Sequence, residues 1–195
     1  MRIRKLLALP VFWLLALLMA CSGAAENAMT QWASAFAESA AGVPKALGDL
    51  AGPCLFAVLM GLSRVLCARV SRRVDVRKLM LACSALCLGC YLLASLAALP
   101  ALGLAGCALC GFSVGILWPG TLSVAAKVCP AGGTALFAFL ALAGDLGGTV
   151  GPLTVGTVSS LAGGDLRTGF LAAAAFPVVL VLGLLSLRKT ASSRG

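Results

Sequence analysis

Residues 14–32 read LLALLMACSGAAENAMTQW, an apolar run that continues into polar residues without a helix breaker. A basic cluster at residues 2–5 precedes this run, and Cys21 follows Leu18-Met19-Ala20, which is close to the cleavage box of a lipoprotein signal. The polar part carries a carboxylate and two amides, at Glu26, Asn27 and Gln31. The stretch is therefore either a secretion signal that is removed or a membrane helix with one polar face.

The composition of the chain favours the membrane helix. Hydrophobic residues make up 61% of the 195 residues and charged residues only 11%, with a mean hydropathy of +1.07, which leaves too little polar surface for a globule in water. Apolar runs that can cross about 30 Å of hydrocarbon, at roughly 20 residues each, recur along the whole chain. Met19 also stands where a lipoprotein signal usually has a small residue. We therefore expect residues 1–21 to be retained, without a lipid on Cys21.

Proline, glycine and charged clusters divide the chain into six candidate helices. Their predicted bounds are residues 6–37, 46–69, 79–98, 101–126, 133–160 and 168–187. Backbone polar groups inside hydrocarbon must be satisfied within the segment, so helices are expected, and no segment alternates like a barrel strand. The sequence therefore predicts an all-α integral membrane protein with six transmembrane helices.

Basic residues gather on one side of this predicted bundle. Twelve belong to the ends of the chain and to two connections: Arg2, Arg4, Lys5, Arg69, Arg72, Arg73, Arg77, Lys78, Lys127, Arg188, Lys189 and Arg194. The other side has Lys45 and Arg167, with Arg64 near a helix end. Because cytoplasmic loops carry the excess of Lys and Arg, we expect both termini to be cytoplasmic. The net charge of +9 then indicates the orientation of the chain in the membrane, and nucleic-acid binding is not expected.

Two motif matches are better explained by packing than by chemistry. The pairs Cys87/Cys90 and Cys107/Cys110 fit a zinc-ribbon spacing, but each lies among Leu, Ala and Gly inside a predicted span, so no metal site is expected. The sequence GFSVG at residues 111–115 matches the serine-hydrolase elbow, yet the chain contains no histidine to activate a serine. We therefore expect no enzymatic activity, and interpret Gly111 and Gly115 as a helix contact.

The polar residues of the first span form an ordered stripe. From Glu26 onward they fall within about 140° of a helical wheel at 100° per residue, and Trp32 points the opposite way. The stripe comprises Ser22, Glu26, Asn27, Thr30, Gln31, Ser34 and Glu38. It either lines a cavity within the membrane or is a surface face of a helix that leaves the membrane near Ala28. Both interpretations are compatible with the sequence.

Asp145 lies near the middle of the fifth candidate helix. A carboxylate at this depth is costly and usually faces an aqueous pathway or a partner, although a protonated Asp can also bond a neighbouring helix. Pro152 interrupts the backbone ladder, and the surrounding glycines suit a helix that packs closely and slides or rocks: Gly144, Gly147, Gly148, Gly151 and Gly156. Trp118-Pro119-Gly120 is a second expected break, with an aromatic ring beside it.

Together these features resemble the carboxy-terminal half of a major facilitator superfamily (MFS) transporter over nearly the whole chain. The longest basic loop of that family carries G-x-x-x-D-R-x-G-R-R. Residues 68–73, ARVSRR, keep its three arginines, Arg69, Arg72 and Arg73, and lack its Asp and Gly. Residues 147–156, GGTVGPLTVG, partly resemble the glycine–proline antiporter motif, and residues 23–38 beside 48–64 resemble fucose-permease-type sugar transporters.

The resemblance implies a single domain, residues 1–195, that forms an MFS half-transporter bundle in the plasma membrane without a cofactor. Such transporters place their solute between two six-helix halves, so the partners would be lipid, a small solute and an N-terminal half or a second copy. The chain is then a truncated product, a member of a split pair or a self-associating protein. A non-transporting assembly protein or a degenerate remnant stays open as the alternative.

A proton-coupled mechanism follows as a hypothesis from the two intramembrane carboxylates. Removal of a carboxyl group from water favours its neutral form, so Glu26 or Asp145 could exchange protons near neutral pH. Asn27 and Gln31 would bond the hydroxyls of a small polar solute, such as a sugar, with Trp118 as an aromatic platform. Arg69, Arg72 and Arg73 would belong to a gating loop.

Overall fold

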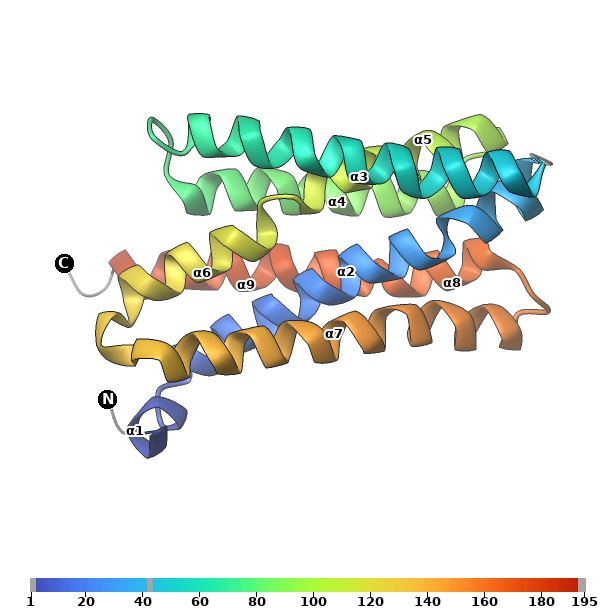
Figure 1. Ribbon diagram of the computed structural model, residues 1–195. Helices are drawn as coiled ribbons and strands as arrows, with labels where there is room; N and C mark the ends of the chain where they lie inside the picture. The colour runs from blue at the N-terminus through green and yellow to red at the C-terminus, as the bar shows by residue number, and fades with distance from the viewer. Residues whose placement is uncertain (1–2, 42–43, 193–195) are drawn as a thin grey trace.

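The computed structural model describes residues 3–41 and 44–192, and every regular element in those ranges is a helix (Figure 1). The elements are α1 (Ile3–Leu7), α2 (Pro10–Ala41), α3 (Lys45–Val70), α4 (Val76–Leu96), α5 (Pro100–Val114), α6 (Leu117–Val128), a 3₁₀ turn η1 (Pro130–Gly132), α7 (Gly133–Leu161), α8 (Leu166–Ala173) and α9 (Ala175–Ser192). Within the described residues, six helical segments are long and apolar enough to cross a membrane. The predicted all-α bundle of six spans is thus confirmed.

Prolines explain where the observed helices differ from the predicted ones. Pro10 begins α2 and separates it from the short α1, because proline fits the first turn of a helix and cannot donate a backbone hydrogen bond. The fourth span is divided at residues 115–116, three to four residues before Pro119, as the sequence led us to expect. The sixth span is divided at Ala174, before Pro177, which was not expected. Proline removes the bond to the carbonyl four residues earlier, so each break lies one turn upstream.

Pro152 has a smaller effect than the sequence analysis proposed. The helix α7 continues from Gly133 to Leu161 with Pro152 inside it. The expected interruption of the backbone hydrogen bonds of α7 is therefore limited to the one donor that Pro152 lacks. The carbonyl of Pro152 accepts a bond from outside the helix, because Trp32 Nε1 of α2 donates to it at 3.0 Å.

The helix α2 lies at the centre of the bundle. Figure 1 shows it crossing the molecule obliquely beside α7, with α8 and α9 behind it and α3 in front of α4. Its side chains Leu15 and Met19 are fully buried, and Phe36 makes an edge-on ring contact with Phe170 of α8 at 5.4 Å between centroids. The buried Tyr91 of α4 donates its hydroxyl to the Ala25 carbonyl at 2.8 Å.

The helix α3 is packed far less. Only 17% of its most apolar stretch is buried inside the bundle, against 56% of the corresponding stretch of α2. It exposes a series of aliphatic side chains that includes Leu55, Val58, Leu62 and Val65. The helix α3, at the top of Figure 1, is therefore the least buried of the six spans.

The connections are distributed so that the basic residues meet at one end. The α3–α4 and α6–α7 turns lie at the left of Figure 1, at the same end as α1 and the end of α9. This end holds Arg4 and Lys5 of α1, Arg69 at the end of α3, Lys78 at the start of α4 and Lys127 at the end of α6. Five further basic residues have side chains outside the described set: Arg2, Lys45, Arg188, Lys189 and Arg194.

Candidate functional site

The polar stripe of α2 divides between two neighbouring helices. Asn27 is half-buried against α7: its Nδ2 donates to the Gly23 carbonyl at 3.0 Å, and a Cβ added at Gly148 would lie 3.0 Å from that nitrogen. Glu26 is half-buried one residue away, and its carbonyl accepts the Thr30 hydroxyl at 2.7 Å. Gln31 is exposed. The stripe is therefore neither wholly buried nor wholly a surface face.

Glu26 has a charged counterpart on α3. The positive charge of Arg64 attracts the Glu26 carboxyl through space, although no ion pair joins the two among the described residues, and Arg64 lies inside the candidate span Gly52–Val70. The sequence analysis did not include Arg64 among the candidate site residues, because it treated this arginine as part of a helix end. The sequence could have pointed to Arg64, because an arginine within an apolar span costs free energy unless a polar partner or an aqueous pathway is present.

Asp145 is exposed on α7. The described residues provide no hydrogen bond or ion pair to its carboxylate. Its backbone carbonyl accepts the hydroxyl of Thr149 at 3.2 Å, one turn further on. Asp145 is therefore positioned to meet a molecule outside the described chain rather than a neighbouring helix of it.

Backbone-to-backbone contact between α2 and α7 depends on glycine. A Cβ added at Gly147 would collide with the Ala20 carbonyl, one at Gly151 with the Ala24 carbonyl, and one at Gly23 with the Gly144 carbonyl. These are one-turn repeats on both helices, so the two backbones approach along a continuous seam. This is the small-residue contact that the glycines of the fifth span predicted.

Trp118 is part of this seam rather than a free platform. Its half-buried ring packs on Gly144, where an added Cβ would collide with the indole. It lies at the start of α6, next to Pro119 and the break at residues 115–116. On the other side of Asn27, the ring of Trp32 covers Gly156, 2.8 Å from where a Cβ would lie. Two tryptophans thus pack on α7 glycines from neighbouring helices.

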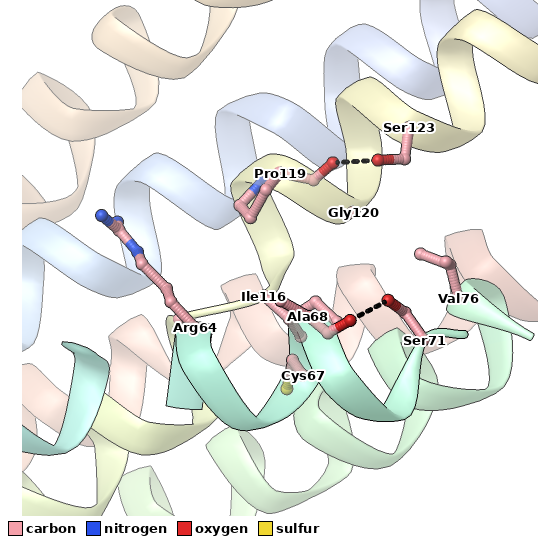
Figure 2. A pocket seen from close by; sticks show the side chains of 10 residues that line it. Arg64, Cys67, Ala68, Ser71, Val76, Ile116, Pro119, Gly120 and Ser123 are labelled. Atoms are coloured by element: carbon pink, nitrogen blue, oxygen red, sulfur yellow. Dashed lines mark hydrogen bonds between the residues drawn. The ribbon is translucent and has the colours of Figure 1, made fainter. Parts of the chain in front are cut away.

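A cavity of about 330 Å³ lies between the end of α3 and the α5–α6 break (Figure 2). Its lining consists of Arg64, Cys67, Ala68, Ser71, Val76, Gly115, Ile116, Pro119, Gly120 and Ser123. Figure 2 shows α3 on one side of it and α6 on the other, with Arg64 at one end and Val76 at the opposite end. Arg64 thus connects the α2 stripe with a cavity that the sequence did not reveal.

The basic loop has no acidic counterpart of the family pattern. Arg69, Arg72 and Arg73 are exposed and surround a surface hollow of about 360 Å³. The nearby Asp75 accepts the backbone N–H of Arg77 at 2.8 Å and so caps α4. Within the part of the chain that is described, no carboxylate forms an ion pair with these three arginines.

Both motif matches lie where helices pack against each other. Gly111 and Gly115 contact the backbone carbonyls of Phe56 and Met60 in α3, so the predicted glycine contact between helices is confirmed. Ser113 is buried and donates to the Cys110 carbonyl at 2.6 Å. The Sγ atoms of Cys87 and Cys110 lie 3.9 Å apart, where α4 packs on α5. No group of three or more potential metal ligands occurs among the described residues.

Comparison with protein families identifies the chain. A sequence model described as the Major Facilitator Superfamily matches residues 2–152 and, in a second overlapping match, residues 54–195. The chain belongs to the major facilitator superfamily. No curated protein and no solved structure matches it. MFS proteins are transporters of small solutes, and the six helical spans make this MFS protein a multi-pass membrane protein.

Proposed function

We propose that this MFS protein works as the carboxy-terminal six-helix half of a proton-coupled secondary transporter. It moves a small polar solute by alternating access, together with an N-terminal half or a second copy of itself. The observation that carries the proposal is the half-buried Glu26, which lies on the polar stripe of α2 and interacts with Arg64 across to α3.

Glu26 has the environment of a proton-coupling group. It is half-buried within a candidate membrane span, and the positive charge of Arg64 acts on it from α3. A conformational change or a bound solute that alters its exposure to water or its distance from Arg64 would decide whether it holds a proton. Asp145 is the second candidate, exposed toward whatever faces α7.

Neutral amides beside Glu26 provide solute contacts. Gln31 is exposed, and Asn27 keeps its amide oxygen for a solute hydroxyl while its nitrogen bonds the Gly23 carbonyl. Amides bind hydroxyls without the cost of burying a further charge. The aromatic ring of Trp118, which packs on Gly144 of α7, lies beside the break in the fourth span.

Rocking of one six-helix half against the other would involve the glycine seam and the basic loop. Gly147, Gly148 and Gly151 contribute no side chains of their own to the α2–α7 seam, so the two helices can shift against each other. Pro152 removes one backbone bond within α7. Arg69, Arg72 and Arg73 would act at the cytoplasmic gate, with both termini cytoplasmic and the plasma membrane as location.

The test is uptake of labelled solute into vesicles that contain the chain with its partner half, with and without an imposed pH gradient. Glu26→Gln should abolish uphill accumulation, because the amide cannot carry the proton. Downhill exchange should survive, since the binding groups remain. Asp145→Asn should do the same if the proton passes through α7.

Glu38→Gln is the matched control, because Glu38 lies on the same stripe and is exposed near the end of α2. It should accumulate solute like the parent protein. If Glu26→Gln and Asp145→Asn also accumulate solute like the parent, both carboxylates are structural and the proposal of proton coupling is wrong.

A further inference from the structure

Arg64 is exposed, and its side chain extends back along α3 rather than toward the basic end. Its Nη2 lies 3.6 Å from the sulfur of Met60, one turn earlier on α3. In Figure 2 its side chain points away from Ser71 and Val76, which mark the α3–α4 turn, and toward the ribbon of α2. A snorkelling arginine would extend the other way, to the nearest headgroups. The position is therefore adapted to a partner within the membrane.

That arginine supplies the only formal charge among the residues that line the 330 Å³ cavity. The remaining walls are mostly apolar or small, with Cys67 and Ala68 from α3 and Ile116 and Pro119 from the α5–α6 break. The two hydroxyls already donate to their own helices, Ser71 to the Ala68 carbonyl at 3.1 Å and Ser123 to the Pro119 carbonyl at 2.8 Å. The cavity thus has one cationic end and an apolar body.

A neutral solute in this cavity would leave the positive charge of Arg64 without a negative partner. When Glu26 takes up a proton, the exposed guanidinium of Arg64 loses the one carboxylate among the described residues that is found to attract it. An anionic group restores the pairing, and a guanidinium binds a carboxylate through two parallel hydrogen bonds. The volume of about 330 Å³ is at the small end of ligand sites, which suits a compact molecule.

We propose that the cavity between α3 and the α5–α6 break binds a small amphipathic carboxylate, with Arg64 as its receptor. Arg64 is shared between this anion and Glu26, so that protonation of Glu26 releases Arg64 to the solute. The transport role of this site rests on the proposed function, whereas the binding does not. An acidic solute with an apolar body replaces the sugar that the family resemblance implied.

The experiment uses the full chain in lipid nanodiscs and fluorine NMR of para-fluorobenzoate, with para-fluorobenzamide as the neutral isostere. The benzoate is expected to bind at least about tenfold more tightly than the benzamide, because its bonds to Arg64 are charge-assisted. Arg64→Gln should reduce benzoate binding to the level of the benzamide. Glu26→Gln should strengthen benzoate binding, because it removes the competing carboxylate.

Lys127→Gln is the matched control, since it removes one positive charge from the basic end outside the cavity lining. It should bind benzoate like the parent. Ser123→Leu should weaken both probes, because Ser123 is exposed and its enlargement fills the cavity without entering the core. Equal losses of benzoate binding in Arg64→Gln and Lys127→Gln would show diffuse attraction to the basic end and overturn the site.

The two proposals fail in distinguishable ways. If Arg64→Gln leaves benzoate binding unchanged, the carboxylate site is refuted, while proton-coupled transport of a neutral solute remains testable by uptake. If benzoate binds through Arg64 but the carboxylate variants still accumulate solute uphill, the proposed proton coupling is refuted and the site stands.

Discussion

Asp165 illustrates what a single side chain contributes to this bundle. It precedes α8, and its carboxylate accepts the backbone N–H of Arg167 at 3.1 Å and of Thr168 at 3.3 Å. It also accepts the Thr168 hydroxyl at 2.6 Å. These bonds, the Thr168 hydroxyl first, hold the pKa of Asp165 below its ordinary value. The carboxylate therefore satisfies donors that the first turn of α8 would otherwise leave without a partner.

Replacing this cap gives a prediction with a defined pH dependence. Asp165→Ala should cost roughly 0.5–2 kcal/mol of stability at neutral pH. Because the pKa is lower in the folded chain, the cap contributes fully above the unfolded value of 3.8 and is lost as the pH falls through the folded value. Thermal unfolding in detergent should thus show the two proteins converging only in strong acid. Asp165→Asn, which keeps an acceptor oxygen, should lose less than Asp165→Ala; equal losses would contradict the capping role.

Between elements, the α2–α7 seam decides how the bundle is held together. At Gly147 the two backbones are so close that a Cβ would collide with the Ala20 carbonyl, which cannot move without displacing α2. At Gly61 on α3, by contrast, no atom lies within 4 Å of an added Cβ. Both glycines are inside long helices, so they differ in packing and not in backbone conformation.

This contrast predicts opposite results for the same substitution. Gly147→Ala should lower the stability of the protein by roughly 1–3 kcal/mol, because it forces the seam apart. Gly61→Ala should leave stability unchanged or slightly raised, since alanine is the better helix former. Thermal unfolding of both variants in the same detergent measures the difference. A Gly147→Ala variant as stable as Gly61→Ala would mean that the seam is not closely packed in the protein.

On the scale of the whole molecule, the ends of the bundle differ in charge. Arg69, Arg72 and Arg73 lie at the end with the α3–α4 turn, whereas Arg167 at the other end donates to the Ala97 carbonyl at 2.8 Å. The orientation proposed from this asymmetry places the α3–α4 turn in the cytoplasm.

Cysteine accessibility in intact cells tests that orientation. Ser71→Cys should react with an impermeant thiol reagent only after permeabilisation, because it lies at the basic end. Ala98→Cys, exposed in the α4–α5 connection, should react without it. Labelling of the parent protein gives the background from Cys54, the exposed native thiol among the described residues. Labelling of Ser71→Cys in intact cells would reverse the topology.

The sequence by itself determined the class of this protein, its six spans and part of its packing. Hydrocarbon requires every backbone group to be bonded within its own segment, so length and apolarity were sufficient to find the helices. The contacts of Gly111 and Gly115 were predictable for a related reason, because small residues one turn apart allow another helix to approach closely.

Only the tertiary structure decided which polar groups meet. The sequence grouped Glu26 with Asp145, yet the charge that acts on Glu26 is Arg64 of α3, and Asp145 is exposed on α7 without a bonded partner among the described residues. It offered Trp118 as a platform, and the structure packs that ring on Gly144. The direction of a side chain depends on the rotation and tilt of its whole helix. These are fixed by contacts between distant segments such as the α2–α7 seam, and local sequence patterns do not encode them.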